Sequence, residues 1–332
     1  MKVYAIAEAG TNHNGSLERA LRLVEVAKQS GADSVKFQMI IPEGLYLPSF
    51  IKDGRYVENT VFQKRKRMML QPEDFQRISQ YSSEQGIDFG CSVFDSKGLQ
   101  ILARLQPAYI KFASCDLNNS RLLTEAAQFG RKMIISTGMS TLGEIERAVM
   151  DIIAAGNKDL VLMHCISVYP AETARMNLAF IRTLQSAFGL PVGLSDHTEH
   201  SLAAAIAIGM GITYIEKHIT LNRSDEGFDH AYAMEPKEIA QYFLDVRQSE
   251  QACQLQVGEK VSAVEREVRK RARRGLYAAK DLAEDSILTE ADVLVVRPEG
   301  ALQPNDLPLL LGKRIRRTLR RFEELSLDCF EL

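Results

Sequence analysis

Two lysines and four serines could together hold an anionic ligand. Each of them lies in or directly after a short apolar run: Lys36, Lys111, Ser92, Ser114, Ser136 and Ser195. An ammonium group is a compact cation with three donors, and each hydroxyl adds another donor, so the set suits a phosphate or a carboxylate. The alternative is that each lysine only pairs with a carboxylate of its own chain.

Two histidines could hold a divalent metal ion. His197 and His218 lie just beyond two later apolar runs, and imidazole nitrogens are common metal ligands. Asp196 and Glu216 lie close to them in sequence and could orient the rings. The alternative is that each histidine is satisfied within the core.

Other catalytic patterns are disfavoured. Ser195, Asp196 and His197 include the three residue types of a hydrolase triad, but neighbours at one strand end rarely converge on one another. The sequence contains no H-E-x-x-H, P-loop, G-x-S-x-G or zinc-type cysteine pair. These residues therefore favour an anion site and a candidate metal site over a hydrolase.

Eight short apolar runs must position these side chains. They span 3–7, 34–37, 87–91, 109–113, 133–136, 160–165, 192–194 and 213–215. The runs are partly β-branched and do not alternate with polar residues, which is typical of parallel strands buried on both faces. Amphipathic segments lie between them, such as 17–30 and the one that follows the capping-box pair Thr141 and Glu144, and many end before a glycine.

Eight such units predict an α/β fold, a (β/α)8 TIM barrel. In this fold the carboxyl ends of the strands gather at one face, so the polar residues above should share one pocket. An open doubly wound sheet is the alternative. The number of units and the lack of G-x-G-x-x-G after the first strand weigh against it.

The pattern changes after about residue 236. A long helix over 236–255 is followed by a charged, strand-poor stretch and then by short apolar pieces between turns. We expect a catalytic barrel over 1–255, a linker over 256–274 and a small, mostly β domain over 275–332. A core of that size is marginal alone, so the small domain should dock on another surface.

Composition excludes several classes of protein. The 332 residues carry a net charge of −2, which gives no global field to attract nucleic acid or an anionic membrane. The basic stretches 266–274 and 313–321 are interleaved or flanked with glutamates and lack interleaved aromatic residues. Five cysteines without C-x-x-C, and no apolar run of about 18 residues, predict a soluble cytoplasmic protein with neither nucleic acid nor membrane as a partner.

Ordered motifs run along the whole chain. In one-letter code they include AEAGTNHNG at 7–15, GADSVKFQ at 31–38, IKFAS at 110–114, STGM at 136–139, GLSDHT at 193–198 and IEKH at 215–218. With these the sequence resembles the sialic acid (N-acetylneuraminate) synthase family, including its legionaminic, pseudaminic and spore-coat polysaccharide relatives. RRGLYAAKD at 273–281, with VRP at 296–298, is similar to the antifreeze-like (SAF) domain that follows these barrels.

The resemblance implies a reaction. Phosphoenolpyruvate condenses with an N-acylated mannosamine-type aldose, water adds, and a nine-carbon 2-keto acid forms with phosphate, most simply N-acetylneuraminate or a close analogue. The two lysines and four serines would hold phosphoenolpyruvate, and Glu8 matches the acid/base carboxylate of the family. His197 and His218 would hold a Mn, Mg or Co ion that acts as a Lewis acid, which makes Glu8 and the two histidines the catalytic set.

The resemblance also implies a sugar side and a dimer. Asp116, Tyr169 and Asp229 match positions that contact the sugar, and Arg274 matches an arginine that reaches the N-acyl group in the partner subunit's site. A domain-swapped homodimer is therefore expected. The sequence departs from the family pattern here: the segment 46–69 has little recognisable identity, Phe228 replaces a common proline, and Asn59 is only a candidate for the family's sugar-binding asparagine.

Two other functions are left open. A related phosphoenolpyruvate aldol-type synthase could act on another, phosphorylated sugar, which usually requires extra arginine or lysine on the sugar side. A non-catalytic carbohydrate- or ice-binding protein could be built around the C-terminal domain. That reading gives no reason for the polar residues at the strand ends, and the identity of the amino sugar is left open.

Overall fold

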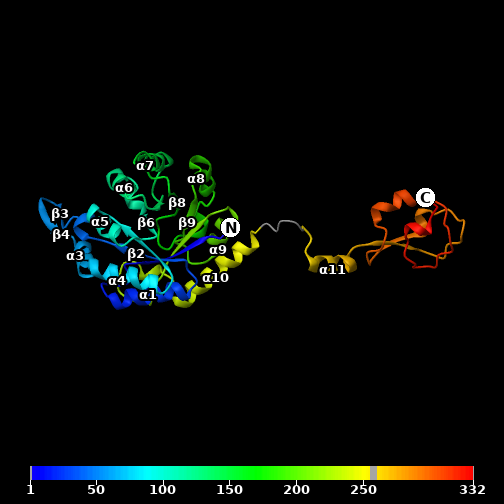
Figure 1. Ribbon diagram of the computed structural model, residues 1–332, viewed down its shortest axis with the longest axis horizontal. Helices are drawn as coiled ribbons and strands as arrows, with labels where there is room; N and C mark the ends of the chain where they lie inside the picture. The colour runs from blue at the N-terminus through cyan, green and yellow to red at the C-terminus, as the bar shows by residue number, and fades with distance from the viewer. Residues whose placement is uncertain (1, 255–259, 332) are drawn as a thin grey trace. The chain divides into compact units, whose positions relative to one another are not determined.

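The computed structural model describes residues 2–254 and 260–331. The chain divides into two compact units, Met1–Gln254 and Leu255–Leu332. The first unit is a closed barrel of eight parallel strands surrounded by helices (Figure 1).

The barrel strands form at all eight of the predicted apolar runs. They are β1 Tyr4–Gly10, β2 Ser34–Met39, β5 Asp88–Val93, β6 Tyr109–Phe112, β7 Met133–Ser136, β8 Leu160–His164, β9 Val192–Ser195 and β10 Tyr214–His218. Their order around the barrel is β1-β10-β9-β8-β7-β6-β5-β2. Because β1 pairs in parallel with both β2 and β10, the sheet closes. The (β/α)8 prediction is confirmed, and the open-sheet alternative is wrong.

A helix follows each barrel strand and covers its outer face. These helices are α1 Leu17–Gln29, α4 Pro72–Glu84, α5 Ser96–Arg104, α6 Ser120–Ala127, α7 Leu142–Ala154, α8 Phe180–Phe188, α9 Leu202–Gly209 and α10 Pro236–Ala252. The predicted capping box opens α7, where Thr141 and Glu144 satisfy each other's backbone N–H groups. Gly31 follows α1 with φ +85°, which favours glycine at this turn into β2. Apolar side chains of the strands and helices form the main core.

The inside of the barrel has a separate apolar plug. It consists of Ile6, Tyr109, Ile134, Val161 and Met163. Side chains two residues apart on a strand share a face, so the polar side chains at the carboxyl ends stand above this plug. The plug therefore gives the polar pocket a floor.

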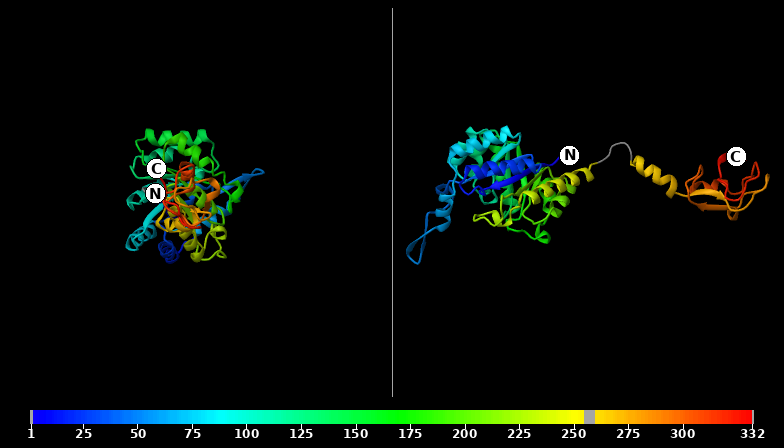
Figure 2. Two further views of the ribbon diagram at one scale, coloured as in Figure 1. Left: turned by 90° about the vertical axis from the view of Figure 1, so that its right-hand side faces the viewer. Right: turned by 90° about the horizontal axis from the view of Figure 1, so that it is seen from below.

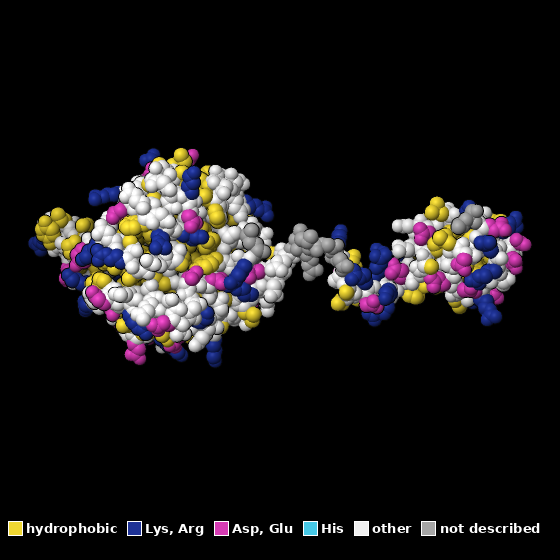
Figure 3. Space-filling view, viewed as in Figure 1, with side chains coloured by type: hydrophobic (Ala, Val, Ile, Leu, Met, Phe, Trp, Pro, Cys, Tyr) yellow, Lys and Arg dark blue, Asp and Glu magenta, His cyan; other side chains and the backbone are white. Residues whose placement is uncertain are grey.

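A long insertion follows β2, within the divergent segment. It contains α2 Pro42–Leu45, an antiparallel hairpin of β3 Ser49–Lys52 and β4 Arg55–Glu58, and α3 Thr60–Arg67. The hairpin projects away from the barrel (Figure 2). Hydrophobic side chains gather on it in Figure 3, and Ile51 and Tyr56 are 70% and 80% exposed.

The second unit has its own small core. It contains α11 Ala263–Ala272, the antiparallel pair β11 Gly275–Ala278 and β12 Val293–Val296, and the short α12 Leu307–Leu310. Arg269 of α11 pairs with Glu299 at 2.9 Å, so this helix is attached to the unit. The predicted linker over 256–274 thus includes a helix, while residues 255–259 lie outside the described part. Among the described residues, no helix combines the length and apolar character that crossing a membrane requires.

Candidate active site

Two lysines and two glutamates meet inside the carboxyl end of the barrel. The ammonium group of Lys36 lies 3.1 Å from a carboxylate oxygen of Glu216 and 3.2 Å from one of Glu8. Lys111 lies 3.8 Å from Glu216 on its other side. All four residues are buried, because each stands on an inward position of β1, β2, β6 or β10. Both lysines therefore pair with carboxylates of the barrel, which was the alternative to an anion site. Both lysines also line the cavity described below.

The two glutamates differ in their protonation. Burial raises the pKa of Glu8, with the charge of Glu216 adding to it and Lys36 opposing it. Burial acts in the same direction on Glu216, but Lys111 and Lys36 outweigh it and hold its pKa well below the ordinary value. Two acids whose pKa values are pushed apart can take different roles in one reaction. Glu216 is ionised at neutral pH, while Glu8 is able to gain or release a proton.

The four predicted serines surround the same charges. Ser136 accepts a hydrogen bond from Lys111 at 2.6 Å, and Ser92 accepts one from Lys36 at 3.3 Å. Ser195 donates to Glu216 at 2.8 Å, and Ser114 accepts from the backbone N–H of Gly138 at 3.0 Å. All six residues of the predicted anion site line one cavity of about 280 Å³, together with Glu8, His197 and His218. The barrel thus brings the anion set together with the predicted catalytic set.

The two imidazoles are neutral and lie close together in the lining of the cavity. Their ring centroids are 5.6 Å apart, and burial lowers the pKa of His197 to about 3 and that of His218 to about 4. The carbonyl of Ile166 lies 2.7 Å from Nδ1 of His197 and can only accept, so Nδ1 carries the proton and Nε2 presents a lone pair. The hydroxyl of Ser195 is 3.3 Å from that Nε2, but it donates its hydrogen to Glu216.

These rings fit the ligands of a metal ion. Nδ1 of His218 is buried and has no hydrogen-bond partner in the described structure. Two neutral imidazoles with free nitrogens are suitable donors for a divalent cation. The parts of the chain that the structure describes contain no group of three or more His, Cys, Asp or Glu side chains placed to hold an ion. The protein would therefore supply two donors and leave the remaining positions to water or substrate.

The expected role of Asp196 beside His197 is wrong. Its carboxylate accepts from Thr198 and from the hydroxyl of Tyr242 at 2.7 Å, and so points away from the cavity. Ser195 and His197 both line the cavity, and the side chain of Asp196 between them lies on the opposite face of this extended segment. The carbonyl of Ile166 orients His197 instead.

Of the predicted sugar residues, Tyr169 lines the cavity and Asp229 lies close to it. The ring of Tyr169 stacks on His197 with centroids 4.1 Å apart and on Tyr232 at 4.6 Å. A Cβ atom on Gly10 would lie 3.2 Å from the carboxylate of Asp229 and 3.4 Å from that of Glu8. Asp229 therefore approaches Glu8 across a residue that has no side chain.

The other predicted sugar residues are placed differently. Asp116 is buried in the turn after β6, where burial raises its pKa to about 6, and it is not among the described residues that line the cavity. Arg274 belongs to the second unit and donates to the carbonyl of Val295 at 3.3 Å. Asn59 caps α3 by accepting from the N–H groups of Val61 and Phe62, so the structure gives it a role in the helix.

No role for Gln38 was predicted from the sequence, and Glu216 was linked there only to His218. Gln38 donates to Glu8 at 2.7 Å and lines the cavity. Glu216 bridges both lysines, although the sequence suggested it only as a partner of His218. The alternation of side chains could have found both, because Gln38 stands two residues after Lys36 and Glu216 two residues before His218.

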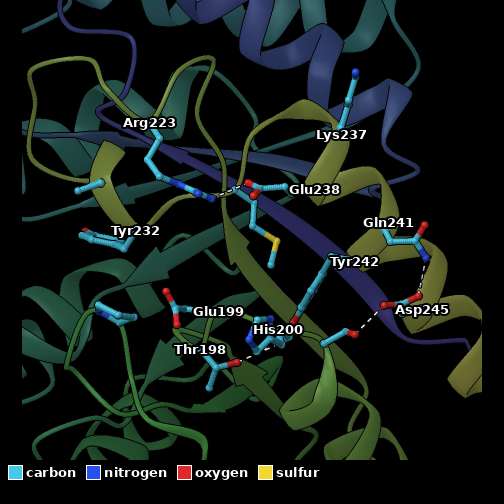
Figure 4. Close-up of a pocket in the computed structure, with 14 residues that line it drawn as sticks. Thr198, Glu199, His200, Arg223, Tyr232, Lys237, Glu238, Gln241, Tyr242 and Asp245 are labelled. Carbon is cyan, nitrogen blue, oxygen red and sulfur yellow. Dashed lines mark hydrogen bonds and ion pairs between the residues drawn. The ribbon is translucent and has the colours of Figure 1, made fainter.

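A larger cleft lies beside this site, between the segment after β9 and α10 (Figure 4). Its volume is about 700 Å³. Several of its polar side chains are engaged with one another: Arg223 with Glu238, and both Gln241 and Ser201 with Asp245. None of Lys36, Lys111, His197 and His218 is among the described residues that line this cleft, so the smaller cavity is the candidate active site.

Comparisons with known proteins identify the family to which the chain belongs. A family model described as the NeuB family matches residues 23–258 of the chain. The chain belongs to the NeuB family. A second model, described as the SAF domain, matches residues 273–330 of this NeuB protein.

Named relatives cover nearly the whole NeuB chain. The chain is 35% identical to the N,N'-diacetyllegionaminic acid synthase of Legionella pneumophila, over 96% of this chain and 92% of the relative. It is 32% identical to the pseudaminic acid synthase of Campylobacter jejuni, over 99% and 97%. The crystal structure of N-acetylneuraminic acid (sialic acid) synthetase from Leptospira borgpetersenii, in complex with citrate, matches with a TM-score of 0.71 at 31% identity, over 81% of this chain and 90% of that one. The predicted resemblance is confirmed.

Proposed function

We propose that this protein condenses phosphoenolpyruvate with an N-acylated mannosamine-type aldose to give a nine-carbon 2-keto acid and phosphate. The observation that carries the proposal is one cavity in which Lys36 and Lys111 stand beside Glu8 and two neutral imidazoles. Membership of the NeuB family, whose named relatives are synthases of this kind, supports it.

The lysines and serines would hold phosphoenolpyruvate. Its phosphate and carboxylate are anionic, and Lys36 and Lys111 are the buried cations of the cavity. Ser92, Ser114, Ser136 and Ser195 would add hydroxyl donors. Their fixed positions on barrel strands would keep the enol carbon aimed at the aldehyde of the sugar.

Glu8 would manage the proton of the reaction. Bond formation turns the aldehyde oxygen into an alkoxide, which must gain a proton, and the water that adds to the second carbon must lose one. A carboxyl group whose burial raises its pKa can hold a proton and then return as a base. Gln38, at 2.7 Å, would keep it oriented.

A divalent ion, Mn, Mg or Co, would be held by His197 and His218. Such an ion would polarise the aldehyde as a Lewis acid. The support is the neutral state of both rings and the free nitrogen on each. The protein itself would keep both imidazoles neutral and oriented toward the cavity.

The sugar would lie at the mouth of the cavity. Tyr169 of the cavity lining and Asp229 near Glu8 would contact it, and Asp116 would need to contribute from the turn after β6. We further propose that Arg274 of the partner subunit reaches the N-acyl group in a domain-swapped homodimer. A cytoplasmic location stays a prediction from the sequence.

Subunit mixing tests the shared site. Glu8→Gln and Arg274→Ala proteins, each of low activity alone, should regain activity when they are mixed under conditions that exchange subunits, because heterodimers contain one intact site. Mixing Glu8→Gln with Glu8→Gln is the control. No gain after verified exchange would show that the site is not shared.

A phosphorylated acceptor is a second candidate. The guanidinium of Arg65 lies 3.5 Å from the ring centroid of Phe228, the residue before Asp229, and Lys64 lies 5.2 Å from the same ring. With the sugar bound near Asp229, these two cations would be available to pair with a phosphate on it.

One substrate panel tests both candidates. Phosphate release should require phosphoenolpyruvate, a divalent ion and one sugar of the panel together. The panel would contain N-acetylmannosamine, its 6-phosphate and 2,4-diacetamido trideoxyhexoses, and mass spectrometry would identify the product. Release at the same rate with every sugar, or with none, would overturn the proposal. A preference for the phosphate ester would select the second candidate.

A further inference from the structure

A closed cluster of polar side chains lies behind the two imidazoles, on the outer side of β9 and β10. We call its four residues, Asp196, Thr198, Lys217 and Tyr242, the strand-end clamp. The carboxylate of Asp196 and the ammonium of Lys217 are 3.5 Å apart, with side chains 0% and 2% exposed. No step of the proposed reaction uses any of these residues.

The cluster satisfies its own polar groups. One carboxylate oxygen of Asp196 accepts from the N–H and the hydroxyl of Thr198, at 2.9 and 2.7 Å. The other accepts from the hydroxyl of Tyr242 at 2.7 Å. Lys217 donates to the carbonyl of Thr198 and lies 5.0 Å from the ring centroid of Tyr242. Figure 4 shows Tyr242 extending from α10 toward the segment that carries Thr198.

The alternation of the strands links this cluster to the cavity. Asp196 immediately precedes His197, and Lys217 immediately precedes His218. The backbone N–H of Asp196 donates to the carbonyl of Glu216 at 2.9 Å, so the two segments are joined where the histidines leave the strands. The ion pair on the outside and the two imidazoles on the inside therefore share the same short stretch of backbone.

The rings themselves have few polar restraints. His197 is held by one carbonyl, and Nδ1 of His218 has no hydrogen-bond partner in the described structure. A buried ion pair adds little net stability, since its desolvation offsets most of the Coulombic gain. We therefore expect the ion pair between Asp196 and Lys217 to affect the geometry of the strand ends more than the free energy of unfolding.

We infer that the strand-end clamp positions the two imidazoles and thereby sets the affinity of the site for a divalent ion. The inference rests on the proposed metal site at His197 and His218. The clamp residues do not touch the ion or the substrate. They act as positioning residues, through the backbone that they hold.

Metal titration tests this inference directly. Asp196→Asn and Lys217→Met should each weaken Mn²⁺ binding, measured by isothermal titration calorimetry of the full chain, by about 10- to 100-fold. The matched control is Arg247→Met, which lies on the same helix as Tyr242 but pairs with Asp33 near the start of β2, at 2.6 Å. It removes a partly buried ion pair and should lower Tm without changing the Kd for Mn²⁺.

The outcomes separate the inference from the proposal beneath it. If the wild-type protein shows no Mn²⁺ binding, the proposed metal site is wrong and the inference falls with it. If the wild type binds but the clamp variants bind equally well, only the inference is overturned. The inference is also overturned if Arg247→Met weakens Mn²⁺ binding as much as the clamp variants do when the loss of Tm is equal.

Tyr242→Phe keeps the test decisive if a charge variant fails to fold. It removes one hydroxyl and leaves the ring packed. It should raise the Mn²⁺ concentration needed for half-maximal activity while kcat at saturating Mn²⁺ is kept. An unchanged Mn²⁺ requirement and an unchanged Kd in a folded Tyr242→Phe protein would also overturn the inference.

Discussion

The two ends of the barrel use similar residue types in opposite ways. At the amino end, Asp33 accepts from the N–H of Ala5 at 2.9 Å and pairs with Arg247 at 2.6 Å. There too the hydroxyl of Tyr109 bonds Ser34 at 2.8 Å. At the carboxyl end, several buried side-chain atoms lack hydrogen bonds. Among the described residues, every such side-chain atom belongs to a strand end or to a segment beyond it: Glu8, Asn12, His13, Arg19, Arg65, Glu216 and His218.

This difference separates stability from function. A buried polar group without a hydrogen bond costs free energy, so proteins usually satisfy such groups. Among the described residues the unsatisfied atoms avoid the amino end, and those of Glu8, Glu216 and His218 belong to residues that line the cavity, where a substrate or an ion could complete them. Some of the latter, such as the Oε2 atoms of Glu8 and Glu216, still have the charge of Lys36 nearby. Substitutions at the two ends should therefore have different consequences.

The largest expected effect is on catalysis at the carboxyl end. Glu8→Gln should lower kcat by about 10²- to 10⁴-fold, since it removes the acid/base group and keeps its shape. Tm should not fall, because burial already disfavours the charged form of Glu8. A continuous phosphate-release assay and calorimetry would measure both. Near wild-type kcat in this variant would remove Glu8 from the mechanism.

The reverse result is expected at the amino end. Asp33→Asn should lower the free energy of unfolding by about 1–3 kcal/mol, because Arg247 and the N–H of Ala5 lose a charged acceptor. Urea denaturation would measure the loss, and kcat should stay at the wild-type value. A loss of activity at temperatures where this variant is fully folded would break the comparison between the two ends.

Loss of one hydroxyl at each end gives a matched pair. Tyr109→Phe removes the bond to Ser34 and should cost about 1 kcal/mol of stability, with no change in KM. Ser136→Ala removes the acceptor 2.6 Å from Lys111 and should raise KM for phosphoenolpyruvate by about tenfold, with a smaller change in stability. Urea midpoints and steady-state kinetics would measure both effects. A raised KM in Tyr109→Phe, or a stability loss without a change in KM in Ser136→Ala, would contradict this difference between the two ends.

The smallest effect is in the pH dependence of stability. The pKa of Glu8 is raised from an ordinary value of 4.5, so its favourable contribution is complete below pH 4.5 and is lost as the pH rises through the higher folded value. Asp33 has a lowered pKa, so its contribution is present above 3.8 and is lost as the pH falls through the folded value. The burial of Asp33 opposes that lowering, and its bonds to Lys2, Ala5 and Arg247 outweigh it.

Urea midpoints between pH 3 and pH 8, in EDTA, would show both signs. Wild type should lose stability relative to Glu8→Gln as the pH rises above 4.5. The wild type should be more stable than Asp33→Asn at neutral pH, and this difference in stability should disappear only at acid pH. Parallel curves for wild type and Glu8→Gln would mean that the pKa of Glu8 is not raised in the folded protein.

The amount that the sequence could predict differs between the fold and the site. The eight strands could be predicted from the sequence because a strand buried on both faces is a local run of apolar residues. The inward positions of Lys36, Lys111 and the serines followed from the places of those runs. The hairpin β3–β4 and α11 were not predicted, because the first lies in a segment of little identity and the second in a stretch of charged residues.

The sequence by itself determined the barrel, its family and the residue types that face the cavity. Only the tertiary structure decided which of those residues touch. That Glu216 bridges both lysines, and that Asp196 pairs with Lys217 instead of orienting His197, depends on which strands become neighbours when the barrel closes. Glu216 and Lys36 are far apart in the chain, so no local pattern records their contact. Strand periodicity fixes the face on which a side chain lies, and barrel closure fixes its partner.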